Sequence, residues 1–189
     1  AVSLISDHIF RRQAVSYNNQ MLGILSEQID SAIAQVSRLS FFAYQNETIH
    51  KITSDDADLI QKVHLSSVLE QEFNMWQSFL NYDCITHQSY FIHENEILMS
   101  IPWNALDEMD YQKTAWYQAA KDAKGRLSFY SPESLPELPA SGAGSDSFHF
   151  IALRWIYDIY HKQSSGVLIL DISISHIDTM MEHMNLNPQ

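Results

Sequence analysis

The sequence is poor in cysteine, glycine, proline and basic residues. Its 189 residues include one cysteine, Cys84, so neither an internal disulfide nor a cysteine-rich zinc site can form. The sequence has 11 Lys and Arg residues and 23 Asp and Glu residues, which gives a formal net charge of −12. Affinity for nucleic acid comes mainly from cations that meet phosphates, and only Arg11 and Arg12 place two basic residues side by side. The composition therefore argues against a nucleic-acid partner.

Long hydrophobic runs are also absent. No apolar run exceeds four residues, whereas a helix that crosses a bilayer needs about 20. The chain begins without Met, and no basic segment precedes an apolar one as in a signal peptide. We therefore expect contact with a membrane only through transmembrane segments outside this sequence. With 46% hydrophobic and 12% aromatic residues, the chain can bury one packed core.

The familiar catalytic motifs are missing as well. No Gly-x-Ser-x-Gly turn, His-Glu-x-x-His helix, phosphate-binding loop or glycine-rich dinucleotide turn occurs. Cys84 would need a nearby histidine to act as a nucleophile, and His87 falls on the opposite face of a predicted strand. His176 and His183 could share a helix face with two methionines, but such spacing is typical of packing. We expect no enzymatic activity, cofactor or metal in this domain.

The N-terminal quarter of the chain has a strong helical pattern. Residues 1–49 contain no proline and one glycine, and their apolar residues recur with a 3,4 spacing. The spacing predicts one helix of roughly 40 residues, about 60 Å long. Either part of its apolar stripe packs on the domain's own sheet, or its N-terminal half projects as a stalk and pairs with a second copy, with Asn18 setting the register. The stripe consists of Val15, Leu22, Leu25, Ile29, Ala32, Val36, Leu39 and Ala43.

The rest of the chain alternates between helical and strand patterns. Ser54 is a candidate N-cap for a second helix that runs to Leu80. Residues 131–147 hold three of the five prolines and predict a long exposed loop. Because most strands are neighbours in sequence, the order predicts an α+β fold in which an antiparallel sheet has helices on one face. The strand patterns cover 85–94, 96–101, 126–130, 148–160 and 166–174, and further helical patterns cover 110–121 and the residues from Ser175.

Three stretches resemble the extracellular Cache sensor domains of bacterial membrane receptors, especially the membrane-distal, PAS-like half of a double Cache module. The first is the long helix and its successor, followed by the strand at 85–92. The second is Ala115-Trp116-Tyr117-Gln118-Ala119-Ala120, with Phe129-Tyr130-Ser131-Pro132 behind it. The third is 166–174, which is similar to the closing strand of the family. The resemblance implies a stalk helix over 1–49 and a PAS-like sensor domain over 50–189.

The resemblance also implies a ligand pocket. In Cache receptors for amino acids, an Arg two residues before the Trp grips the ligand carboxylate, aromatic side chains line the wall, and an Asp on the closing strand takes the amine. This sequence has Thr114 where that Arg belongs, so the bidentate carboxylate clamp is broken. A sugar, another polar metabolite or no small ligand at all fits better than a generic amino acid. The residues kept by position are Trp116, Tyr117, Tyr130 and Asp171.

Each of these residues has a structural interpretation beside the functional one. Asp171 interrupts an apolar strand, so its carboxylate needs either a ligand or a partner such as the neighbouring loop or Arg154. Trp116 and Tyr117 fit a core as well as a pocket wall. Trp103 follows a proline in the loop nearest the expected pocket mouth. Arg126 and Arg154 are the only arginines beyond the first helix, so any contact with an anion is expected to use one of them.

These patterns favour an extracytoplasmic sensor domain of a transmembrane receptor, on the extracellular side of the plasma membrane. Such a domain binds a small molecule, forms a homodimer through its N-terminal helix and passes the signal through its terminal helices. A two-component sensor histidine kinase is the leading class, and a chemoreceptor or a protein-interaction module without a ligand is the alternative. Residues 1–50 carry a net charge of −1 and the remainder carries −11. Two sensor domains would therefore repel each other, while their N-terminal helices could pair.

Overall fold

A computed structural model describes residues 2–79, 84–101, 110–135, 138, 149–157, 164–174 and 177. Three helices, α1 (Val2–Gln45), α2 (Glu47–Ile52) and α3 (Leu59–Gln77), precede a five-stranded antiparallel sheet, which confirms the α+β class. A fourth helix, α4 (Ala115–Asp122), lies between the second and third strands along the chain. The remaining elements are β1 (Cys84–His93), β2 (Glu96–Ile101), the 3-10 turn η1 (Tyr111–Lys113), β3 (Ser128–Tyr130), the 3-10 turn η2 (Pro132–Ser134), β4 (His149–Tyr157) and β5 (Ser164–Ile174).

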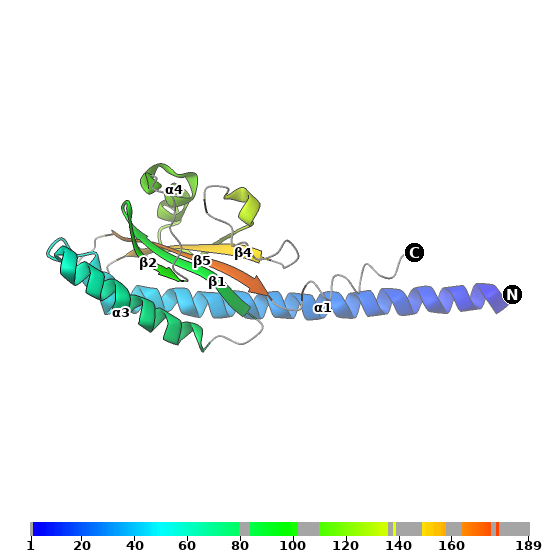
Figure 1. The fold of residues 1–189 in the computed structure, drawn as a ribbon. Helices are drawn as coiled ribbons and strands as arrows, with labels where there is room; N and C mark the ends of the chain where they lie inside the picture. Colours follow the sequence, from blue (N-terminus) through cyan, green and yellow to red (C-terminus); the bar gives the residue numbers. More distant parts are fainter. Residues whose placement is uncertain are drawn as a thin grey trace.

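Helix α1 has two halves in different surroundings. Its C-terminal half lies along the sheet, and its N-terminal half extends beyond it (Figure 1). Val15 and Leu22, in the N-terminal half, are 59% and 55% exposed. The predicted stripe therefore packs on the domain's own sheet in the C-terminal half, and its pairing with a second copy in the N-terminal half stays a prediction. The buried members of the stripe are Leu25, Ala32, Val36, Leu39 and Ala43.

The helix predicted over 1–49 ends earlier, at Gln45. Asn46 is the reason, because its side chain bonds two different segments. Its Oδ1 accepts the backbone N–H of Ile49 at 3.0 Å and so caps α2, while its Nδ2 donates to Glu72 Oε2 on α3 at 2.9 Å. The chain therefore turns at Asn46 and brings α2 and α3 onto the end of α1.

The prediction that Ser54 caps the second long helix is wrong. Helix α3 begins at Leu59, and its N-cap is Asp58, whose Oδ1 accepts the N–H of Gln61 at 2.8 Å. The Gln61 side chain accepts the N–H of Asp58 in return, at 3.1 Å. This reciprocal pair satisfies two N–H groups that the helix itself cannot. The Ser54 hydroxyl instead accepts the N–H of Asp56 in the turn before the helix.

The strands follow the order β2-β1-β5-β4-β3, and every neighbouring pair is antiparallel. The predicted hairpin at 85–101 is β1 and β2, which turn at Glu94 and Asn95. The strongest predicted strands are β4 and β5, which pair along the whole of β4. At Gly166 the backbone φ is +139°, and an added Cβ would lie 2.4 Å from the carbonyl oxygen of Ile92. Glycine is therefore required where β5 passes β1.

Alternate residues of a strand point in opposite directions, so the sheet has two faces. Helices α1, α2 and α3 share one face, as predicted, whereas α4 lies on the other. We call these faces the α1 face, which packs against α1, α2 and α3, and the α4 face, which packs against η1, α4 and residues after η2 (Figure 1). The sheet residues of the α1 face include Phe91, Met99, Ala152, Ile156, Leu168, Leu170, Ile172 and Ile174. Those of the α4 face include Tyr90, Ile92, Ile151, Leu153, Trp155, Val167 and Ile169.

Several predictions concern residues outside the described ranges. They include Trp103, the final helix from Ser175, and most of the loop over 131–147. Within the described part of the chain, no helix is both long and apolar enough to cross a membrane.

Candidate functional site

The structure places four of the predicted site residues on the α4 face. Trp116 and Tyr117 belong to α4 itself and are 1% and 5% exposed. Tyr130 lies on β3 and packs partly buried against the same core. Asp171 lies on β5 opposite Ile151 of the α4 face. These four residues therefore border one side of the sheet, although they come from three different elements.

Aromatic rings fill the end of this face that lies beneath α4. The ring of Tyr117 stands perpendicular to that of Trp155 on β4, with centroids 5.1 Å apart. Trp116 packs against Tyr117 at 5.9 Å and against Tyr111 at 6.2 Å. The indole N–H groups of Trp116 and Trp155 are buried and have no hydrogen-bond acceptor among the residues that the structure describes. A buried N–H without a partner is costly, so this aromatic end offers two donors to any acceptor that enters.

Thr114, which stands where the family has its carboxylate-binding Arg, has a structural task. Its hydroxyl donates to the carbonyl of Tyr111 at 2.7 Å and accepts the N–H of Tyr117 at 3.3 Å. Thr114 is thus the N-cap of α4. The side chain is 7% exposed and ties η1 to α4, so it adds no positive charge to this face.

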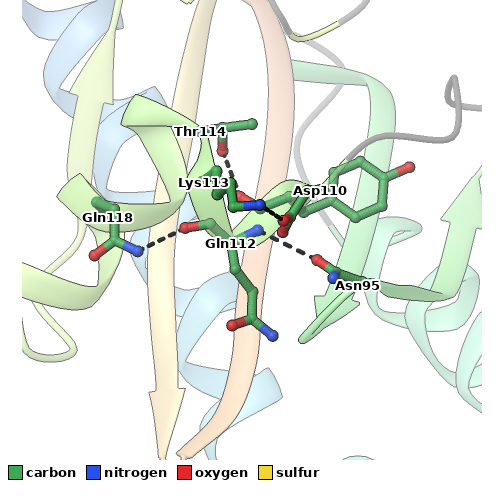
Figure 2. Close-up of polar contacts among 7 residues, drawn as sticks. Asn95, Asp110, Gln112, Lys113, Thr114 and Gln118 are labelled. Atoms are coloured by element: carbon green, nitrogen blue, oxygen red, sulfur yellow. Dashed lines mark hydrogen bonds and ion pairs between the residues drawn. The ribbon is translucent and has the colours of Figure 1, made fainter.

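A polar network holds the N-terminal end of α4 against the β1–β2 turn, as Figure 2 shows. Asn95 Oδ1 accepts the backbone N–H of Gln112 at 3.3 Å, and Gln118 Nε2 donates to the Gln112 carbonyl at 2.6 Å. Lys113 and Asp110 form an ion pair at 2.6 Å across the same turn, which raises the pKa of Lys113 and lowers that of Asp110. The network fixes the start of α4 to the hairpin.

The other end of the α4 face is polar. Asp171 is 6% exposed, and its Oδ1 lies 3.5 Å from Nδ1 of His149 on β4. Gln88, which is the register partner of Asp171 on β1, accepts the hydroxyl of Tyr90 at 3.0 Å. Ser173 lies opposite His149 and is also buried. A buried carboxylate is therefore surrounded by groups that can donate or accept hydrogen bonds, which is the chemistry that recognises a polar ligand.

The polar and aromatic ends lie a short distance apart on one surface. Ile151 neighbours Asp171, and Trp155, four residues along β4, contacts Tyr117. At about 3.3 Å per residue, these two positions on β4 are about 13 Å apart. The α4 face thus combines a buried acid at one end with aromatic rings at the other, where two indole donors have no acceptor among the described residues.

The two arginines that were candidates for anion binding lie elsewhere. Arg154 points to the α1 face, because it is three residues from Ile151 on the same strand. Its guanidinium bonds the Gly125 carbonyl and the Ser40 hydroxyl, so the predicted contact with Asp171 is replaced by these partners. Arg126 is exposed and donates from Nε to the Ala123 carbonyl at 3.3 Å. Neither arginine joins the four residues on the α4 face.

Sequence reasoning missed three residues of the polar end, which are Gln88, Tyr90 and His149. A signal for two of them was present, because Gln88 and Tyr90 are two residues apart on a predicted strand and so share a face. His149 is placed beside Asp171 only by the register of β4 with β5. Among the described residues, no group of three or more His, Cys, Asp or Glu side chains is arranged to hold a metal ion.

A separate groove lies between α3 and β2, away from these residues. Its volume is about 760 Å³. The ion pair of Lys62 with Glu96 crosses it at 2.9 Å, and the exposed side chains of Leu59 and Val63 form part of its wall. The groove borders the edge strand of the sheet and contains none of the predicted site residues that the structure describes.

Comparison with known proteins agrees with the predicted fold. No protein-family model and no curated protein matches the sequence. The chain is similar to the solved ligand-binding domain of the amino-acid chemoreceptor PctC of Pseudomonas aeruginosa PAO1 in complex with GABA, with a TM-score of 0.51 and 14% identity over 89% of this chain and 62% of that one. It is also similar to the ligand-binding domain of the Campylobacter jejuni chemoreceptor Tlp3 in complex with 4-methylisoleucine, with a TM-score of 0.36 and 16% identity over 80% of this chain and 59% of that one.

The chain thus spans less than two thirds of the length of either solved domain. The likeness to the PctC domain shows that the chain shares the fold of a chemoreceptor ligand-binding domain. At 14% identity it shows the fold alone, so function has to be argued from the site.

Proposed function

We propose that this chain is an extracytoplasmic ligand-sensing domain of a transmembrane signalling receptor. The fold supports this proposal, because the similar solved structures are chemoreceptor ligand-binding domains. The observation that carries it is the α4 face, where Asp171 is buried at one end and aromatic side chains are gathered at the other. A sensor histidine kinase and a chemoreceptor fit these features equally well, and in either case catalysis belongs to another part of the receptor.

The chemistry of the α4 face suggests the class of ligand. Asp171 favours a cationic amine, since a buried carboxylate is stabilised by an opposite charge. The indole N–H groups of Trp116 and Trp155, which have no acceptor among the described residues, favour a hydroxyl or carbonyl oxygen on the ligand. Thr114 supplies no guanidinium for an α-carboxylate. We therefore propose a small amine that also carries a neutral oxygen acceptor, such as an amino alcohol or an amino sugar.

A thermal-shift screen followed by calorimetry tests the proposal. The probes are ethanolamine, glucosamine, glucose, γ-aminobutyrate, alanine and succinate. A ligand that binds the native state at 100 times its Kd stabilises it by about 2.7 kcal/mol, which is readily measured. We expect the amino alcohol or the amino sugar to raise the Tm, and Asp171→Asn to abolish that shift.

Asp122→Asn is the matched control, because Asp122 is exposed at the end of α4. It should leave the shift unchanged. A shift that survives Asp171→Asn would contradict the assignment of the site. If none of the six probes stabilises the chain, the interaction module without a small ligand becomes the better proposal, as the close packing of Trp116 and Trp155 would allow.

The proposed signalling mechanism requires that two copies of this chain associate. Val15 and Leu22 leave apolar surface exposed on the half of α1 that extends beyond the sheet (Figure 1). We propose that this half pairs with its counterpart in a homodimer. Leu22→Glu should shift the chain toward monomer in sedimentation experiments, whereas Leu59→Glu, at a 77% exposed position on α3, should not. Equal effects of the two substitutions would contradict pairing through α1.

A further inference from the structure

Arg154 joins three parts of the molecule that are far apart in sequence. Its Nε donates to the carbonyl of Gly125, in the turn that follows α4, at 3.0 Å. Its Nη1 donates to the hydroxyl of Ser40 on α1, also at 3.0 Å. The side chain itself comes from β4. One guanidinium therefore connects the helix of the candidate ligand site to the helix that leads out of the domain.

The surroundings of this cation are unusual. No ion pair of Arg154 with a carboxylate occurs among the described residues. The guanidinium carbon instead lies 5.0 Å from the ring centroid of Tyr44 and 5.8 Å from that of Phe41, both on α1. Burial lowers the pKa of Arg154, and the nearby Tyr44 hydroxyl partly offsets this effect. An apolar side chain would hold α1 to the sheet without this desolvation, but it would not direct two hydrogen bonds to two elements.

The turn after α4 is also built for close contact with α1. Gly125 has φ +81°, and an added Cβ would lie 2.6 Å from the Tyr44 hydroxyl and 3.5 Å from the Trp155 carbonyl oxygen. A side chain at this position would be strained at this φ and would displace the Tyr44 hydroxyl. The preceding residue, Lys124, also has a positive φ of 50°. The tight turn brings the Gly125 carbonyl to Arg154.

We propose that Arg154 is a positioning residue that couples α4 to α1. The start of α4 is fixed to the β1–β2 turn through Asn95 and Gln112, so a ligand that displaces α4 moves mainly its C-terminal end and the Gly125 turn. The two hydrogen bonds of Arg154 carry that displacement to Ser40. The role in signalling rests on the proposed sensor function, whereas the mechanical link does not require any ligand.

Hydrogen exchange on the intact chain, followed by mass spectrometry, tests the link. Ser40→Ala removes only the end of the link on α1. With Arg154 present, we expect this substitution to speed exchange in the peptide over 115–126 about fivefold, which corresponds to about 1 kcal/mol for one hydrogen bond. In an Arg154→Met background, Ser40→Ala should have no further effect on that peptide. This dependence of one substitution on the other is the signature of coupling through Arg154.

Controls separate coupling from general loosening of the fold. Arg126→Met removes an arginine from the same turn that does not reach α1, and it should leave exchange over residues 40–45 unchanged. Arg154→Lys replaces Arg154→Met as the background if the methionine variant does not fold, because an ammonium cannot hold both acceptors in the same geometry.

Two results would overturn the proposal. The first is an unchanged exchange rate in the peptide over 115–126 when Ser40 is replaced by alanine. The second is an equal increase in that rate with Arg154 present and in the Arg154→Met background. Because no ligand is added, these results are independent of the screen that tests the sensor function, and either proposal can fail alone.

Discussion

The two faces of the sheet are built from different chemistry. The buried hydrophobic sheet residues of the α1 face are aliphatic, apart from Phe91 and Met99, and they pack against the apolar stripe of α1. The α4 face carries buried aromatic residues, and it ends at a carboxylate, a histidine and a glutamine. Apolar burial stabilises a fold without specifying a ligand, whereas buried polar groups cost stability unless they are partnered. The comparison supports the proposal that the α1 face maintains the fold and the α4 face binds the ligand.

The largest expected effect on stability comes from two adjacent residues of β1 that point to opposite faces. Phe91 points to the α1 face with 0% exposure, and Tyr90 points to the α4 face with 2% exposure. Phe91→Ala should lower the free energy of unfolding by about 3–5 kcal/mol, because it leaves a cavity in a packed core. Tyr90→Phe removes the hydroxyl that donates to Gln88 and should cost about 0.5–1.5 kcal/mol. Urea denaturation measures both, and equal losses would contradict the division.

The fold was largely predictable because the strands have clear patterns. The runs at 85–101 and 148–174 are rich in apolar and β-branched residues, and polar residues separate the two strand patterns within each run. Both strand pairs could therefore be predicted. The start of α3 was not predicted, because the segment from Ser54 to Asp58 contains several residues that can cap a helix. Only Asp58 has a glutamine three residues later that returns the hydrogen bond.

The site was predictable only in part, because a sequence does not give the register between strands. Asp171 and Arg154 lie on predicted neighbouring strands, and an ion pair between them was reasonable. In the structure Asp171 pairs with Ile151 and Arg154 with Leu168, an odd offset that turns the two side chains to opposite faces. The same register brings His149 to Asp171, which no local pattern indicates.

Helix caps give a second and smaller comparison of the faces. Asp58 caps α3 on the α1 side, and Thr114 caps α4 on the other. Asp58→Ala should cost about 1 kcal/mol, and Thr114→Ala up to about 2 kcal/mol, because the Thr114 hydroxyl is buried and serves both a donor and an acceptor. Ser54→Ala is the control and should stay within about 0.5 kcal/mol. A larger loss for Ser54 than for Asp58 would contradict the observed start of α3.

The smallest expected effect is a loss of folding stability at alkaline pH. One tyrosine on each side of the sheet contributes to this loss. Burial raises the pKa of Tyr44, on the α1 side, and that of Tyr117, on the α4 side, above the ordinary value of 10.0. For Tyr44 the nearby Arg154 reduces the shift. A raised pKa means that the folded state favours the neutral phenol. This stability is therefore fully present below pH 10.0 and is lost as the pH rises through the folded pKa.

Urea denaturation from about pH 9 to pH 11 should show a declining free energy of unfolding. Tyr117→Phe and Tyr44→Phe should each make the decline less steep. A decline that neither substitution alters would assign the alkaline loss to other groups and remove this parallel between the faces.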